Sequence, residues 1–122
     1  MKVGKTLVTL VTLALMVALP LAGCAIIRWR EARDTDQLLD MAGFRVKPAD
    51  TPAKQANLNA MPPLKLVERS KDGGVVYTYA DPYNCLCLYV GGPAEYATYQ
   101  RLQQEIVQAQ REASIVWELW GP

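Results

Sequence analysis

The segment Leu64–Val90, LKLVERSKDGGVVYTYADPYNCLCLYV, holds the clearest β-strand signal of the chain. Three short runs within it are rich in β-branched and aromatic residues, namely 64–70, 75–80 and 84–90. Asp72-Gly73 between the first two runs suits a tight hairpin turn, and Asp81-Pro82 opens a second turn before the third run. The segment therefore predicts a three-stranded antiparallel meander.

Side chains alternate between the two faces of a strand, so each strand of this meander divides into two sets. The sets are Val75, Tyr77 and Tyr79 on the middle strand, and Cys85, Cys87 and Tyr89 opposite Leu86, Leu88 and Val90 on the third. A sheet with an apolar face must bury that face against another element. The rest of the chain has to supply the element that covers this face.

A long helix is predicted from Pro93 onward, after Gly91-Gly92. Its apolar residues recur at spacings of three and four and form one continuous stripe: Tyr99, Leu102, Ile106, Ala109, Ala113, Val116 and Trp120. The stripe either covers the open face of the meander or forms a coiled-coil seam. Its two alanines and few heptads favour the first reading. Trp117 and Trp120 are expected to extend past the sheet toward a partner or lipid.

The region before the meander predicts shorter elements. Leu38, Leu39 and Ala42 share a helical face, with Gly43 as the stop. Asp34 or Thr35 is expected to cap the start of this helix.

Residues 44–49 alternate apolar and basic side chains, which indicates a short strand or an extended link. Thr51-Pro52 opens a brief helix that ends at Met61-Pro62-Pro63. Together these features predict an α+β domain over residues 34–122, with the meander packed against the long C-terminal helix and one or two short helices ahead of it.

The first 23 residues have the layout of a secretory signal peptide. Lys2 and Lys5 form a positive end, residues 6–19 carry no charge, and Pro20 is expected to break the helix. The alternative is an uncleaved membrane helix, since residues 6–27 are just long enough to span a bilayer. Pro20 and the small residues that follow it argue against that alternative.

The stretch Leu21-Ala22-Gly23-Cys24 resembles the lipobox of bacterial lipoproteins. The resemblance implies that the Cys24 sulfur receives a diacylglyceryl group, that cleavage makes Cys24 the new N-terminus, and that this terminus is acylated too. Several acyl chains suit lasting attachment because one chain holds a protein only marginally. In this family an aspartate after the cysteine often marks inner-membrane retention. Ala25 stands there, so the resemblance favours the outer membrane, facing the periplasm.

Residues 24–33 are expected to tether the domain to the bilayer. Ile26, Ile27 and Trp29 alternate with arginines, a pattern that suits a lipid–water boundary. The same pattern fits an ordinary first helical turn with its stripe on the protein, and both readings stay open.

Cys85 and Cys87 allow three interpretations. They are two small buried apolar side chains, a disulfide in an oxidising compartment, or a soft-metal site such as one for Cu(I). A regular strand holds residues two apart at about 6.6 Å between α-carbons and points them in parallel, so a disulfide would need a bulge or turn. A structural zinc site needs four ligands, and only two cysteines remain once Cys24 carries lipid.

The composition excludes several function classes. The chain has no histidine, which excludes histidine-based catalysis and zinc sites. Loss of the leader leaves 11 of the 13 basic residues beside 12 acidic ones, and this near-neutral balance gives no electrostatic reason to bind nucleic acid. Only Ser70 and Ser114 could serve as serine nucleophiles, and no phosphate-binding loop or cofactor motif is present. We therefore expect neither an enzyme nor a cofactor.

The stretch from Tyr79 onward resembles a set of small proteobacterial lipoproteins that have no assigned activity. The shared pattern comprises Tyr79, Asp81, Pro82, Cys85, Cys87, Leu88, Tyr89, Val90, Gly91, Tyr96 and Tyr99. A looser likeness, in size and layout only, is to the accessory lipoproteins of the outer-membrane protein assembly machinery. The resemblance brings no known substrate.

The sequence thus predicts a lipid-anchored envelope protein that serves as a binding or structural module. Its partners would be the membrane, through the anchor, and another envelope protein. The candidate contact residues are the aromatic side chains Tyr83, Tyr89, Trp117 and Trp120. Each of them could instead be core, and for Tyr89 the core is favoured. The alternative function is thiol redox or copper handling by Cys85 and Cys87.

Overall fold

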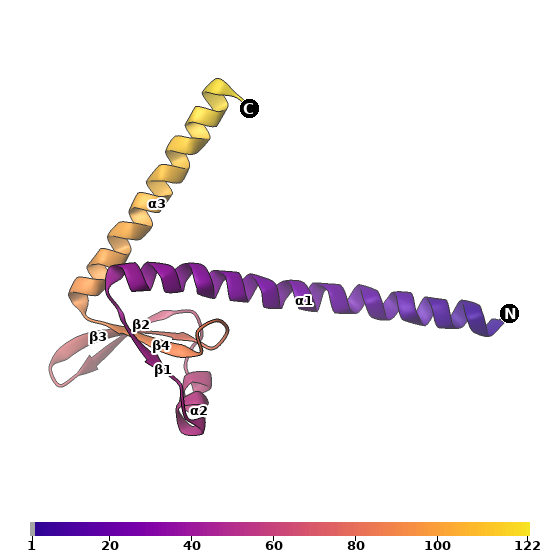
Figure 1. Cartoon of the computed structure of the whole chain (residues 1–122), viewed down its shortest axis with the longest axis horizontal. Helices are drawn as coiled ribbons and strands as arrows, with labels where there is room; N and C mark the ends of the chain where they lie inside the picture. Colours follow the sequence, from indigo (N-terminus) through magenta and orange to yellow (C-terminus); the bar gives the residue numbers. More distant parts are fainter. Residues whose placement is uncertain (1) are drawn as a thin grey trace.

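A computed structural model of the chain describes residues 2–122, and the side chains of residues 17–22 fall outside that description. Met1 and the side chains of Leu21 and Ala22, which the signal-peptide and lipobox predictions involve, therefore lie outside the described residues. In chain order the elements are α1 (Lys2–Ala42), β1 (Arg45–Pro48), α2 (Pro52–Ala60), β2 (Leu66–Lys71), β3 (Gly74–Asp81), β4 (Cys87–Gly91) and α3 (Pro93–Trp120) (Figure 1).

The strands form one antiparallel sheet in the order β1-β4-β3-β2. The predicted meander β2-β3-β4 is confirmed, and the α+β class with a long C-terminal helix is confirmed with it. The expected count of three strands is wrong, because β1 pairs with β4 and adds a fourth. Pro48 ends this edge strand, where a missing N–H group does least harm to the sheet.

The turn between β2 and β3 has the conformation that its sequence predicts. Asp72 and Gly73 both have positive φ angles, of 52° and 76°. A two-residue hairpin loop of this kind matches the right-handed twist of the flanking strands, and aspartate followed by glycine tolerates it best. The hairpin register from Leu66↔Tyr79 to Lys71↔Gly74 follows from that turn.

The C-terminal end of α1 is a glycine cap, as predicted. Gly43 has φ 91°, its N–H group donates to the Asp40 carbonyl at 3.1 Å, and the Phe44 N–H group donates to the Leu39 carbonyl at 3.0 Å. These two bonds define the Schellman motif, in which the residue after the glycine contacts the last helical turn. Phe44 and Leu39 are both buried in the core, so the cap also directs the chain into β1.

The N-terminal half of α1 differs from expectation. The helix continues through Pro20, so the predicted break there is wrong, and Asp34 and Thr35 lie inside it rather than at its start. Arginine, glutamate and alanine between residues 28 and 33 are good helix formers, so the helix extends upstream of the packed residues. Residues 24–33 are therefore helical. None of the helices that the structure describes is long and apolar enough to cross a membrane.

One face of the sheet carries the core. The last part of α1 and the first part of α3 cover it, and α2 lies on the opposite side of the sheet (Figure 1). Phe44 and Tyr99 pack edge to face with ring centroids 6.4 Å apart, while Tyr77 and Tyr96 stack at 4.0 Å. We call the sheet, Ala32–Ala42 of α1 and Pro93–Leu102 of α3 the packed base.

Gly91 allows this packing. A Cβ atom built on it would lie 2.7 Å from the Phe44 ring, which is itself buried. No side chain fits between β4 and that ring. The absence of a side chain at this position thus lets the residue that follows the α1 cap enter the core.

Only the start of α3 belongs to the packed base. Tyr99 is buried, Leu102 is half-buried, and every residue of 103–120 is exposed. The prediction that the apolar stripe covers the sheet therefore holds only as far as Leu102, and Trp117 and Trp120 are exposed beyond it, as expected. Figure 1 shows α3 crossing α1 beside the sheet and then projecting away from it. We call Gln103–Trp120 the outer half of α3.

Candidate functional site

The outer half of α3 exposes large apolar side chains that no other described element covers. Trp120 has 84% of its surface exposed and Trp117 has 63%. The same stretch also exposes Ile106, Val107, Ile115, Val116 and Leu119. Scattered apolar residues are normal on a protein surface, but a concentration of them on one half of a helix, with two tryptophans among them, is typical of an interaction site.

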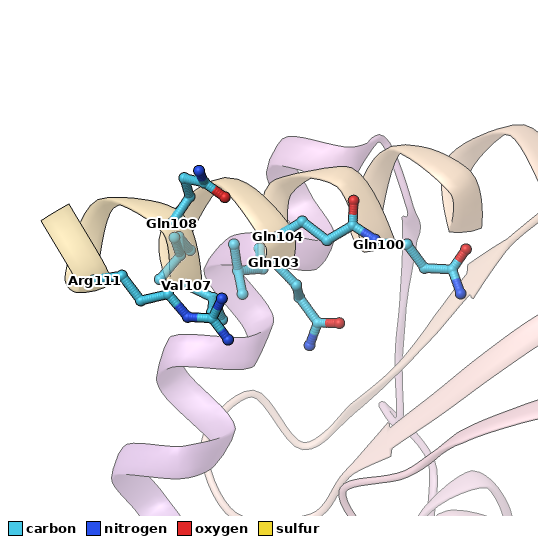
Figure 2. Close-up of a pocket in the computed structure, with 8 residues that line it drawn as sticks. Gln100, Gln103, Gln104, Val107, Gln108 and Arg111 are labelled. Atoms are coloured by element: carbon cyan, nitrogen blue, oxygen red, sulfur yellow. The ribbon is translucent and has the colours of Figure 1, made fainter.

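An open notch marks the point where α3 leaves the packed base. It has a volume of about 750 Å³ and is lined by Leu38 of α1 and, from α3, by Gln100, Gln103, Gln104, Ile106, Val107, Gln108 and Arg111. Figure 2 shows the glutamine side chains spread along α3 above α1. Gln103 donates a hydrogen bond to the Tyr99 hydroxyl at 2.8 Å. Five of the eight residues that line the notch are polar, and Leu38, Ile106 and Val107 add apolar surface.

The four aromatic residues predicted as a contact surface do not lie together. Trp117 and Trp120 are on the outer half of α3, and Tyr83 is exposed on the loop between β3 and β4. Tyr89 is only 3% exposed and packs edge to face on Tyr79, so it lies in the core, which the sequence favours for it, and cannot be a contact residue. It shares the buried face of β4 with Cys87, as strand alternation requires.

The proposed anchor lies on α1. Cys24 is exposed and is not in a disulfide, and Gly23 before it is half-buried. Ile27 and Trp29 on the following turns are exposed as well, and the Arg33 guanidinium lies 5.6 Å from the centre of the Trp29 ring. This contact is a cation–π interaction along a solvent-exposed helix.

Cys85 and Cys87 form a disulfide, with their α-carbons 5.2 Å apart. The intervening Leu86 has φ 52°, a left-handed conformation that turns the chain back and brings the two cysteines together. The strand accordingly starts at Cys87, later than predicted, and Leu86 is exposed rather than aligned with Leu88 on a sheet face. The turn that sequence geometry requires for such a disulfide is therefore present.

Asp81 organises the loop that carries this disulfide. Its carboxylate is fully buried and accepts hydrogen bonds from the N–H groups of Tyr83 at 2.7 Å, Asn84 at 2.9 Å and Cys85 at 3.0 Å. Burial opposes ionisation of Asp81, but hydrogen bonds from Asp36 and from these backbone groups outweigh it and hold the pKa below its usual range. The loop is thus built around a buried negative charge.

Asp36 connects α1 to this loop. Its Oδ2 accepts a hydrogen bond from the Asn84 side chain at 2.9 Å, and the residue is only 4% exposed. Burial raises the pKa of Asp36 to about 7, and its hydrogen bond with Asp81 adds to the shift. Asp36 and Asp81, which we call the carboxyl pair, therefore share a proton below neutral pH.

Among the described residues, two buried polar side-chain atoms lack a hydrogen-bond partner, Oδ1 of Asp36 and the Tyr79 hydroxyl. Burial raises the pKa of Tyr79, an interaction with the Thr35 side chain opposes that shift, and the negative charges of Asp36 and Asp81 add to it. One oxygen of each aspartate and the Cys85 sulfur all lie within 4.8 Å of one another.

Sequence reasoning missed the carboxyl pair, since it treated the acidic residues as scattered surface groups. A signal was present on α1, where Ala32, Asp36 and Leu39 follow the spacing of one buried helical face. Asp81 followed a β run directly, but nothing local placed it against α1.

No protein-family model, curated protein or solved structure matches this chain. The outer half of α3 and the carboxyl pair with its neighbouring disulfide are therefore the two features from which function must be argued.

Proposed function

We propose that this protein is a lipid-anchored, non-catalytic envelope protein that binds another envelope protein through the outer half of α3. The observation that supports this proposal best is the exposure of Trp117 and Trp120, at 63% and 84%. Both lie on a helix that extends past the sheet (Figure 1). Tryptophan concentrates binding energy at interfaces, because a large apolar area is removed from water at low conformational cost.

The charges on this surface favour a protein over a lipid headgroup as the partner. The outer half of α3 carries one basic residue, Arg111, and three acidic residues, Glu105, Glu112 and Glu118. An acidic helix is repelled by the anionic headgroups that attract basic ones. An apolar groove on a neighbouring protein would receive the stripe without that penalty.

The anchor supports an envelope location. The lipobox-like Leu21-Ala22-Gly23-Cys24 places the acceptor sulfur on an exposed part of α1. Cleavage there would leave a helix from Cys24 to Ala42, about 28 Å long at 1.5 Å per residue. Such a helix would hold the packed base at a defined distance from the bilayer, whereas a flexible tether would not.

Site-specific photocrosslinking in intact membranes tests the partner. A photoreactive phenylalanine analogue replaces Trp120 in one chain and Glu118 in a control chain. The two positions lie about 200° apart around the helix, so they sample opposite sides of the same turn. Position 120 should give a protein adduct and position 118 should not. Equal adducts at both positions, or none at either at native abundance, would reject the proposed surface.

The anchor is tested separately with an alkyne-tagged fatty acid supplied to growing cells. Cys24→Ala should lose the label and leave the membrane fraction, while the neighbouring Ala25→Ser should keep both. Retention of fatty mass by Cys24→Ala would contradict lipid attachment at this sulfur.

A further inference from the structure

We propose that reduction of the Cys85–Cys87 disulfide creates a buried zinc(II) site, in which the two thiolates and the carboxyl pair are the four ligands. This inference is independent of binding through α3, since it uses the loop between β3 and β4 and the part of α1 packed against it.

Three of the four proposed ligand residues already lie together. Asp36, Asp81 and Cys85 each place one candidate ligand atom within 4.8 Å of the others, and the Cys87 sulfur is bonded to that of Cys85. Zinc binds four ligands tetrahedrally at about 2.3 Å for sulfur and about 2.1 Å for oxygen, which puts neighbouring ligands about 3.4 to 3.8 Å apart. Reduction lets the two sulfurs separate to this spacing, and movement of the Cys87 side chain toward the carboxyl pair would complete the tetrahedron.

Each carboxylate keeps a free position for a cation. A carboxylate has about four acceptor positions, and three of those on Asp81 are used by backbone N–H groups. Oδ2 of Asp36 is bound by Asn84, while its Oδ1 is buried without a partner when the carboxyl is ionised. A metal ion would therefore bind Oδ1 of Asp36 and the remaining position on Asp81 without displacing a hydrogen bond.

A second, independent observation points into the same cluster. Oδ1 of Asp36 belongs to a residue that is only 4% exposed, and it is buried without a hydrogen-bond partner. An unpaired buried carboxylate oxygen costs free energy, and a bound metal ion would satisfy it. Asn84 and the backbone N–H groups already fix the orientation of the two carboxylates, as the groups behind metal ligands usually do.

The ligand set selects the metal. Two carboxylate oxygens are hard ligands that Cu(I) does not favour, whereas two thiolates with two oxygens suit Zn(II), which is borderline in softness. Sequence alone argued against zinc because only two cysteines were free. The fold supplies the two missing ligands from positions 45 residues apart in the chain, Asp36 and Asp81.

The redox step is balanced by a dithiol reductant. The dithiol forms its own disulfide and transfers two electrons and two protons, so the Cys85–Cys87 bond breaks and two thiols result. Zinc then displaces the two thiol protons as the thiolates bind it. The oxidised protein lacks both thiolates and should hold no zinc.

Zinc competition with a chromophoric chelator tests the site on the full-length chain in detergent, with Cys24→Ser to remove the third thiol. The sample is reduced with a phosphine, which is then removed. The reduced chain should take up one zinc ion and the oxidised chain none. Asp36→Asn should weaken binding by about tenfold to a hundredfold. The control Asp50→Asn should leave binding unchanged, because Asp50 is exposed beside Lys54.

Cobalt(II) substitution in the reduced chain reports the type and number of the ligands without altering either aspartate. A thiolate-to-cobalt charge-transfer band together with intense visible bands would show a four-coordinate site with sulfur ligands. Absence of zinc uptake on reduction, or equal uptake by oxidised and reduced chains, would overturn the proposal. Unchanged affinity in folded Asp36→Asn would also overturn it, since the carboxyl pair would then not bind the metal. Should that variant not fold, a cobalt spectrum without four-coordinate bands is the contradicting result.

Discussion

The two halves of α3 have the same apolar spacing, but the first half packs on the core and the outer half is exposed to solvent. In the packed base, Tyr99 is 7% exposed and contacts Phe44, while Val116 and Trp120 continue the same stripe into solvent. The difference arises from length. A helix of 28 residues is about 42 Å long, and the longest strand, with 8 residues, spans about 27 Å. An apolar stripe on a helix therefore predicts a surface that is to be covered, but it does not identify what covers it.

The largest expected effect concerns the carboxyl pair in the packed base. The pKa of Asp36 is raised from 3.8 to about 7 on folding, chiefly by burial. The folded state then binds its proton more tightly than the unfolded state does, so the stabilisation is complete below pH 4 and is lost as pH rises through 7. The loss is at most about 4 kcal/mol, at roughly 1.4 kcal/mol per pH unit.

Denaturant titrations between pH 4 and pH 8 measure this slope. Asp36→Asn cannot ionise, so its free energy of unfolding should depend much less on pH than that of the natural chain. Asp50→Asn is the control, because Asp50 is exposed and its pKa is lowered by the hydrogen bond from Lys54. Equal slopes in the natural chain and in Asp36→Asn would contradict a buried shared proton.

The next effect separates the two halves of α3 directly. Tyr99→Ala should lower the free energy of unfolding by about 3 kcal/mol or more, because it leaves a cavity beside Phe44. Trp120→Ala should change it by less than about 0.5 kcal/mol, because that ring is exposed. Chemical denaturation of both variants in one detergent checks this. Similar losses in both would place the outer half in the folded core.

A smaller effect is expected where β4 meets the end of α1. Gly91→Ala would push a methyl group into the Phe44 ring, and overpacking of this kind costs about 1 to 3 kcal/mol. Gly74→Ala is the matched control, since its Cβ would meet the Lys71 carbonyl at an ordinary 3.5 Å. Thermal melts of the two variants measure the difference. Comparable melting temperatures would mean that the ring has room to move.

Local features of the fold could be predicted from the sequence, and long-range ones could not. The Asp72-Gly73 turn and the Gly43 cap depend on residues adjacent in the chain, and both were predicted correctly. The pattern of residues 44–49 fits either a strand or a link, because a few alternating residues do not indicate which strand they pair with. The meeting of Asp36 and Asp81 depends on how α1 docks on the sheet, which no local pattern records.

The disulfide between Cys85 and Cys87 could be predicted only in part. Its need for a turn between Cys85 and Cys87 follows from strand geometry, but the left-handed conformation of Leu86 could not be anticipated from the identity of that residue. Leucine rarely adopts positive φ angles, and here the disulfide and the three bonds to Asp81 hold the loop in place. The constraint is tertiary, so residue propensities did not reveal it.

The most direct test of the account is whether the outer half of α3 can lose its tryptophans without loss of stability but with loss of binding. A photoreactive residue at Val116 would report the partner in membranes, in the natural background and with Trp117→Ser and Trp120→Ser combined. We predict an unfolding free energy within about 0.5 kcal/mol of the natural chain and a partner adduct reduced at least tenfold. A fall in stability of several kcal/mol, or an undiminished adduct, would contradict the claim that this surface exists for a partner.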